Sequence, residues 1–102
     1  YPFKTGEEYV WFVAIEGKEV VGFVPVERKS RKKAVINNYY IKAEEAGREE
    51  ILSRLLPAII KEFGPENWLL NSVTLMQDKE IFEKFEFISM DKKWTRYVKM
   101  YR

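Results

Sequence analysis

The sequence predicts one α+β domain with a three-layer, α/β-like arrangement. Its mixed, mainly antiparallel sheet has a central parallel pair of strands and carries two helices. Two β-rich stretches, Tyr9 to Ile15 and Glu19 to Val26, flank a Glu16-Gly17-Lys18 turn and predict a hairpin. An amphipathic stretch from Ile51 to Phe63 separates two further β-rich stretches. Because helical crossovers join parallel strands, we expect those two strands to pair in parallel.

Composition restricts the function classes. The chain has 102 residues, 46% hydrophobic and 33% charged, which fits one soluble globular domain. A net charge of +2 does not favour nucleic acid, and no apolar run approaches the roughly 20 residues of a membrane span. The absence of cysteine and histidine excludes disulfides and removes the commonest metal ligand, so we expect no metal site. Without a signal-peptide pattern, we expect a cytoplasmic location.

The front half of the chain reads as an antiparallel meander. Gly22 and Pro25 lie inside the returning strand and indicate a bulge and an edge or strand end. Arg28 to Lys33 then holds five cations in six positions. This run could contact phosphates, but a solvated tip between two strands is the favoured interpretation, and nucleic acid is not expected as a partner.

A third strand is predicted from Ala34 to Ile41. Asn37 and Asn38 stand in its middle, where Asn is depleted, and Tyr39 and Tyr40 follow at once. One face of this strand could line a substrate cleft. Alternatively, its polar groups are half-buried and bonded to neighbouring backbone, and the sequence leaves both interpretations open.

The first helix is expected from Ile51 to Phe63, after an acidic loop from Lys42 to Glu50. Glu49 and Glu50 would lie in its first turn, where carboxylates favour the positive end of the helix dipole. Pro57 predicts a kink, because the apolar spacing continues in phase beyond it. The residues that share one helical face are Ile51, Leu52, Leu55, Leu56, Ile59, Ile60 and Phe63.

The remaining chain predicts a strand, a short helix and a closing hairpin. Trp68 to Leu75 is the strand expected to lie parallel to the third strand. Asp78 to Phe85 is the second helix, with Asp78 as its N-cap. Phe87 to Met90 and Trp94 to Tyr101 form the last hairpin.

From Tyr9 to its end, the chain resembles the GNAT superfamily of acetyl-CoA-dependent N-acyltransferases. The segment VWFVAIEGKEVVGFVPV is similar to the central hairpin of that family, and IFEKFEFI is similar to its junction between the last helix and the next strand. A closing hairpin that ends in YVKM follows. The family's strand and two helices before the central hairpin are not expected in this chain, which we treat as a single domain over residues 1–102.

The resemblance implies acetyl-CoA as acyl donor and an amine as acceptor. In that family the donor binds in a V-shaped opening between the third and fourth of these strands, with its pyrophosphate on backbone amides at the helix start. The resemblance places catalytic candidates at Asn37, Tyr39 and Tyr40, with either tyrosine as general acid. Backbone groups expected to hold the cofactor belong to Tyr40, Ile41, Gly47, Arg48, Glu49, Glu50 and Ile51.

The sequence departs from the family pattern at these positions. Glu49 and Glu50 stand where small residues would meet the phosphates, and the loop has its glycine and arginine in the wrong order. Phe82 replaces a tyrosine that can give a proton to the CoA thiolate, and Glu86 replaces a glycine.

Two hypotheses therefore follow from the sequence. The chain is an N-acyltransferase of an aberrant subfamily, or it is a catalytically inactive GNAT-like module for binding or assembly. An open sheet edge would suit the second role, by pairing with another chain or with a second copy in a homodimer.

Overall fold

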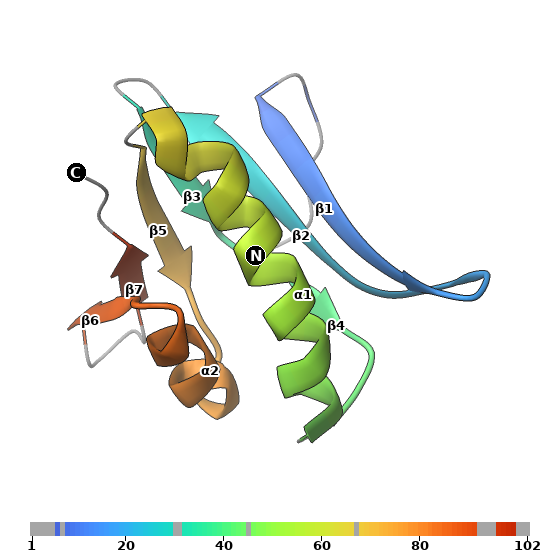
Figure 1. The fold of residues 1–102 in the computed structure, drawn as a ribbon. Helices are drawn as coiled ribbons and strands as arrows, with labels where there is room; N and C mark the ends of the chain where they lie inside the picture. The colour runs from blue at the N-terminus through green and yellow to red at the C-terminus, as the bar shows by residue number, and fades with distance from the viewer. Residues whose placement is uncertain are drawn as a thin grey trace.

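One mixed sheet with a long helix across one of its faces forms the framework of this computed structural model (Figure 1). The structure describes residues 6, 8–29, 32–44, 46–66, 68–91 and 96–99, with side chains as far as Ile88. The strands are β1 (Tyr9–Glu16), β2 (Glu19–Lys29), β3 (Lys33–Ile36), β4 (Tyr40–Ile41), β5 (Leu69–Val73), β6 (Ile88–Asp91) and β7 (Arg96–Lys99). The helices are α1 (Ala46–Phe63) and α2 (Lys79–Lys84), with 3-10 turns η1 (Gly64–Glu66) and η2 (Met76–Asp78).

The strand order is β1-β2-β3-β5-β7-β6, with β4 paired to β2. β3 and β5 are parallel, whereas the pairs β1–β2, β2–β3, β5–β7 and β6–β7 are antiparallel. This arrangement confirms the predicted mixed sheet with a central parallel pair. In the last hairpin, the predicted ends at Trp94 and Tyr101 lie outside the described residues, as do the side chains beyond Ile88.

The long β1–β2 hairpin turns at Gly17, whose φ of 62° is the positive value that glycine adopts without cost. A bulge was predicted near Gly22, and the register does shift beside it: Ala14 pairs with Gly22 and Ile15 with Val20, which leaves Val21 as the extra residue. Pro25, predicted to mark an edge or a strand end, lies inside β2. Gly22 also permits close packing of α1, since a Cβ there would lie 2.9 Å from the Ile51 side chain.

The predicted third strand is two strands with an extra residue between them. Pairing partners advance by four residues on β2, from Glu27 to Phe23, but by five on the other strand, from Val35 to Tyr40. The side chain of Asn38 accepts a hydrogen bond from the Tyr39 amide at 2.9 Å, a local bond that competes with the ladder. The prediction of one continuous strand from Ala34 to Ile41 was therefore wrong.

Helix α1 begins at Ala46 rather than at Ile51, so most of the predicted acidic loop is helical. The helix continues through Pro57, whose side chain is exposed. The predicted apolar face is confirmed, with Ile60 half-buried and the others buried. Arg48 is also buried at 8% exposure, one turn before this face.

Helix α2 follows η2 and packs beside α1, and its Ile81 and Phe82 belong to the same core. Asp78 precedes α2 as predicted, but its side chain makes no capping hydrogen bond. In the part of the chain that the structure describes, no helix has the length and apolar character needed to cross a membrane.

Candidate functional site

The parallel strands β3 and β5 separate at one end of their ladder. β3 and β5 are paired from Lys33 and Leu69 to Ile36 and Ser72. Beyond this point the chain continues as β4, which pairs with β2, while β5 pairs with β7 on its other side. We call the resulting separation of β4 from β5 the split.

Helix α1 begins close to the split, because only the short segment after Ile41 joins β4 to Ala46. The first amides of a helix have no carbonyl partner within it, and the helix dipole adds a partial positive charge there. Together these groups favour an anion such as a phosphate. The backbone groups that the sequence assigns to the cofactor therefore lie at the end of β4 and in the first turns of α1.

Three buried side chains cross the split, and we call Tyr39, Arg48 and Asp78 the buried cluster. Arg48 donates two hydrogen bonds to the Asp78 carboxylate, from Nε at 2.8 Å and from Nη2 at 2.7 Å. The Tyr39 hydroxyl donates to Asp78 Oδ2 at 2.5 Å and accepts from the Leu75 amide at 3.1 Å. Arg48 Nη1 also donates to the carbonyl of Ile41 at 3.3 Å. The cluster thus ties β4 and α1 to the segment that follows β5.

Burial sets the protonation of the cluster. Asp78 is fully buried, and Tyr39 is only 7% exposed. Loss of solvent, and then the bond to Asp78, raise the pKa of Tyr39 well above its ordinary value. The bond to Asp78 raises the pKa of Arg48. The phenol of Tyr39 is therefore held protonated at neutral pH, and the Arg48 charge is neutralised internally.

The acidic residues of the first turns of α1 face solvent. The Glu49 side chain is 48% exposed and its carboxylate accepts from Lys84 Nζ at 2.6 Å. The Glu50 side chain is 73% exposed, with Arg54 Nη2 at 3.9 Å. Both carboxylates can therefore turn away from a ligand at the helix start.

Gly47 has a packing role. A Cβ at this position would lie 2.9 Å from the Ala43 side chain, and the Gly47 amide donates to the Glu44 carbonyl at 3.1 Å. This glycine permits the tight entry of the chain into α1.

The remaining catalytic candidates lie on the other face of the sheet. The Tyr40 side chain is exposed, and its ring packs against that of Phe23 at 5.3 Å between centroids. Asn37 is half-buried and donates from Nδ2 to Glu27 Oε1 at 3.3 Å. The structure therefore separates Tyr39 from Asn37 and Tyr40, which the sequence had grouped together.

Phe82 and Glu86, two positions at which the sequence departs from the family pattern, have different environments. Phe82 is buried, and its ring packs against those of Tyr39 and Phe87 at 5.9 and 5.1 Å. Glu86 has a φ of 67°, a left-handed conformation that glycine adopts far more readily. The backbone at Glu86 thus has a conformation that favours glycine, the residue that the resemblance implies at this position.

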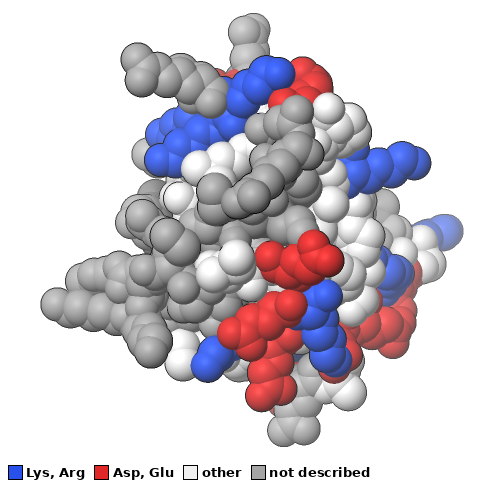
Figure 2. Space-filling view, turned by 60° about the vertical axis from the view of Figure 1, so that its left-hand side comes forward, with Lys and Arg blue, Asp and Glu red and all other residues white. Residues whose placement is uncertain are grey.

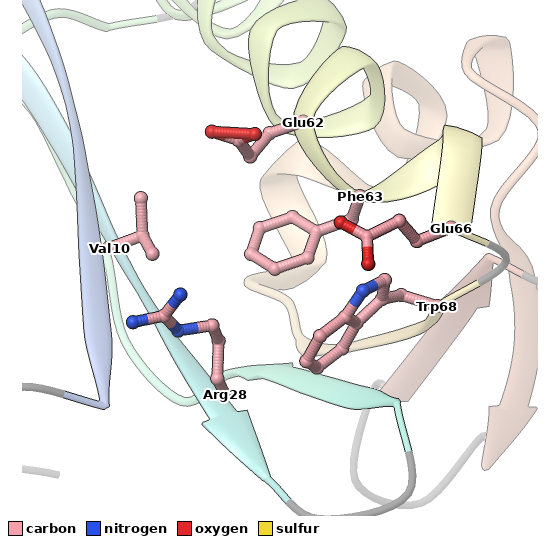
Figure 3. Close-up of a pocket in the computed structure, with 6 residues that line it drawn as sticks. All are labelled: Val10, Arg28, Glu62, Phe63, Glu66 and Trp68. Carbon is pink, nitrogen blue, oxygen red and sulfur yellow. The ribbon is translucent and has the colours of Figure 1, made fainter.

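Two pockets lie away from the start of α1. A pocket of about 110 Å³ is at the other end of the helix, where Figure 3 shows the Arg28 side chain reaching from β2 toward Val10. Its other lining residues are Glu62, Phe63, Glu66 and Trp68. An open hollow of about 260 Å³ is lined by Ile60, Lys84, Phe85 and Glu86.

The basic run from Arg28 to Lys33 spans the end of β2 and the start of β3, and it is partly engaged within the chain. Lys29 Nζ lies 3.3 Å from Glu27 Oε2, and Lys32 Nζ donates to the Glu66 carbonyl at 3.1 Å. On the face drawn in Figure 2, basic and acidic side chains lie next to each other below the centre. This mixture gives no support to nucleic-acid binding.

Two solved structures resemble this chain over most of its length. One is an aminoglycoside 6'-acetyltransferase type Ii, with a TM-score of 0.70 and 16% identity, covering 92% of this chain and 70% of that chain. The other is the aminoglycoside 6'-N-acetyltransferase from Enterococcus faecium, with a TM-score of 0.74 and 12% identity, covering 94% and 76%. The fold is that of the GNAT acetyltransferases.

At these identities the likeness establishes the fold alone. No protein-family model matches the chain, and no curated protein matches it by sequence. The activity must therefore be argued from the site.

The side-chain roles of several residues were missed from the sequence, which named Arg48 only for its backbone. Arg48 extends the apolar stripe of Ile51 and Leu52 by one turn, and a cation on a buried stripe requires an acid nearby. That signal was available, but the partner Asp78, 30 residues away, was assigned to a helix cap instead. Glu27 carried no sequence signal beyond being an acid near a strand end.

Proposed function

We propose that this chain is an N-acyltransferase that transfers the acetyl group of acetyl-CoA to an amine. The observation that carries the proposal is the split itself. β4 leaves the parallel ladder beside the start of α1, so that a strand edge and a helix N-terminus lie together. The likeness of the fold to two acetyltransferases supports the same conclusion.

In this proposal the donor lies along β4. Because β4 pairs with β2 on one side, its opposite edge can pair with the amides of a pantetheine arm. The backbone groups of Ile41 would make these bonds, because the Lys42 amide donates to the Val21 carbonyl and the groups of Tyr40, two residues earlier, therefore also face β2. The Ile41 carbonyl is shared with Arg48. Because α1 begins at Ala46, the pyrophosphate would be held by the amides of its first turn that have no carbonyl partner, such as that of Arg48, and not by those of Glu50 and Ile51, which lie inside the helix. The Gly47 amide already donates to the Glu44 carbonyl.

The reaction forms a C–N bond and breaks a C–S bond. The acceptor ammonium first loses a proton, and the neutral amine then attacks the thioester carbonyl. Collapse of the tetrahedral intermediate releases the CoA thiolate, which takes up the second amine proton. Tyr40 suits the general-acid role better than Tyr39, because Tyr40 is exposed whereas the Tyr39 proton is held by Asp78.

The test is a calorimetric titration of acetyl-CoA into the full chain. We expect a dissociation constant in the micromolar range, about −8 kcal/mol. Glu50→Gln removes a negative charge near the proposed pyrophosphate site and should tighten binding about threefold. Glu62→Gln, at the far end of α1, is the matched control and should leave the affinity unchanged. Equal effects of both variants would contradict the placement of the phosphates.

A second candidate function is a GNAT-like module without transfer activity. The buried cluster favours it, because Tyr39 and Arg48 are committed to Asp78 across the split. Absence of heat at millimolar acetyl-CoA would support this module and overturn the acyltransferase proposal.

A further inference from the structure

The sheet face opposite α1 carries a row of three aromatic side chains, of which two are exposed. Phe23 pairs with Val13 on β1 and with Tyr40 on β4, and directly paired residues point to the same face. The ring of Phe23 lies 5.5 Å from that of Trp11 and 5.3 Å from that of Tyr40. Trp11 and Tyr40 are 38% and 41% exposed. We call Trp11, Phe23 and Tyr40 the aromatic row.

The face on which the row lies is not the helix face. A Cβ at Gly22 would meet Ile51 of α1, so residues adjacent to Gly22 on β2 point the other way. Phe23 is such a residue and points away from α1. Val24 and Val26 lie on the same face as Gly22, toward α1, and are buried in the core. The aromatic row therefore lies on the side of the sheet opposite α1, where its members Trp11 and Tyr40 are exposed to solvent.

Glu27 lies on the same face of β2 as Phe23, because the two residues are four positions apart and side chains alternate along a strand. Its side chain is 18% exposed, and its carboxylate accepts a hydrogen bond from Asn37. Asn37 belongs to the segment between β3 and β4 where the split begins. Glu27 is thus a half-buried carboxylate that is linked by one hydrogen bond to the edge of the proposed acyl site.

Other groups around Glu27 define its charge environment. Lys29 Nζ lies 3.3 Å from Oε2, and Tyr9 on β1 is directly opposite in the ladder. Interaction with Glu27 contributes to a raised pKa of Tyr9, after loss of solvent as the largest cause, and Glu8 acts in the same direction. One carboxylate with a lysine beside it can accept one ammonium group, whereas a polycation would meet repulsion from Lys29.

We propose that Glu27 is the general base of the acyl transfer and that the aromatic row binds the apolar body of the acceptor. The acceptor is then a monoamine with an aromatic or aliphatic body. This assignment rests on the proposed function and adds its substrate class and base. Ring faces contribute to such binding through apolar contact and cation–π attraction.

The proton balance of the step is as follows. The acceptor ammonium gives one proton to a Glu27 oxygen, and the free amine attacks the acetyl carbonyl. The C–S bond breaks, the thiolate receives the second amine proton through Tyr40 or water, and the amide leaves. Glu27 then returns its proton to solvent.

The first experiment examines the acceptor alone. 2-Phenylethylammonium chloride is titrated into the labelled protein without acetyl-CoA, and the indole N–H and tyrosine ring resonances are followed by NMR. We expect shifts at Trp11 and Tyr40 and none at Trp68. Trp11→Ala should abolish them, whereas Ile88→Ala, which removes a more exposed apolar side chain on β6, should not. Shifts confined to Trp68, or none at all, would overturn the acceptor assignment.

The second experiment examines Glu27 in the complete reaction. Glu27→Gln should lower kcat/KM for 2-phenylethylamine by a factor of about 100 or more near pH 7, with acetyl-CoA affinity unchanged. The loss should shrink as the pH rises toward the pKa of the amine, because free amine then needs no base. Glu27→Asp, which keeps the charge, should retain part of the rate and the wild-type pH profile.

Two results would overturn the base role: a loss that is independent of pH, or a parallel loss of acetyl-CoA affinity in both variants. Putrescine acetylated as efficiently as 2-phenylethylamine would overturn the substrate class. Failure of the wild-type chain to bind acetyl-CoA would instead overturn the proposed function, and with it the base role. The calorimetric titration therefore separates the two failures.

Discussion

The two ends of the parallel pair are held together by different interactions. From Lys33 to Ile36, β3 is joined to β5 by a backbone ladder that does not depend on side-chain identity. Beyond the ladder, β4 is joined to the segment after β5 by the buried cluster.

This difference has a physical consequence. The ladder spreads its stabilisation over many weak backbone bonds, so a single conservative substitution costs little. The cluster concentrates it in a few buried polar groups, where loss of one partner leaves a charge or a donor without compensation. The split end should therefore be far more sensitive to single substitutions than the paired end.

Removal of the carboxylate at Asp78 should have the largest effect. Asp78→Asn leaves the buried guanidinium of Arg48 without its counter-charge, and should lower the free energy of unfolding by about 3 kcal/mol. Urea denaturation measures this loss. Glu80→Gln, which changes an exposed acid on α2, is the control and should stay within about 0.5 kcal/mol. Equal effects of the two variants would show that the cluster adds nothing to stability.

Loss of the Tyr39 hydroxyl should come next. Tyr39→Phe deletes the donor to Asp78 and leaves the Leu75 amide without its acceptor, which should cost about 2 kcal/mol. Tyr40→Phe, whose ring is exposed, should cost less than about 0.5 kcal/mol. The two tyrosines are adjacent, so a similar loss in both variants would contradict the separation of their roles.

The raised pKa of Tyr39 predicts that the stability of the protein depends on pH, and the same pair of variants can test this. The folded-state pKa of Tyr39 is raised above its ordinary value of 10.0, so the native state keeps a proton that the unfolded chain loses. The contribution is complete below pH 10 and is lost as the pH rises above it. Tyr39→Phe should therefore flatten the alkaline fall in stability by up to about 1.4 kcal/mol per pH unit.

Alkaline urea titrations of wild type, Tyr39→Phe and Tyr40→Phe would check this slope. Tyr40→Phe should keep the wild-type slope. A slope in Tyr39→Phe as steep as in wild type would show that the Tyr39 phenol ionises equally readily in both states.

The smallest effect is a gain. Glu86 adopts a left-handed conformation, and Glu86→Gly should raise the free energy of unfolding by about 1 kcal/mol by relieving it. Glu86→Ala keeps the strain while removing the carboxylate, and should give no gain. A thermal melt of both variants distinguishes relief of backbone strain from loss of the side chain.

The fold was predictable where local patterns determine it. The Gly17 turn between β-rich stretches, the apolar stripe of α1 and the crossover between two strands all depend on residues close in sequence. The division of Ala34 to Ile41 into β3 and β4 depends instead on the register with β2. Two adjacent asparagines, Asn37 and Asn38, indicated where the strand is interrupted, but they could not give the register of β3 and β4 with β2.

The site was less predictable, because its contacts join distant parts of the chain. The alternation of a strand predicts opposite faces for Tyr39 and Tyr40, with Asn37 on the face of Tyr39. The extra residue between β3 and β4 instead places Asn37 on the face of Tyr40 and leaves Tyr39 in the core. Glu86 was recognised as a glycine position, and its φ agrees. An acidic partner for Arg48 could be expected from the position of Arg48 on the apolar stripe of α1. Only the fold identifies that partner as Asp78.

The central claim is that the split and the start of α1 form the acyl-donor site. It is tested most directly by following backbone amides in ¹H–¹⁵N NMR spectra while acetyl-CoA is added. We expect the largest shifts at Tyr40 and Ile41 and from Arg48 to Ile51, with Phe63 and Trp68 unaffected. Shifts concentrated at Phe63 and Trp68, around the pocket at the other end of α1, would contradict the claim.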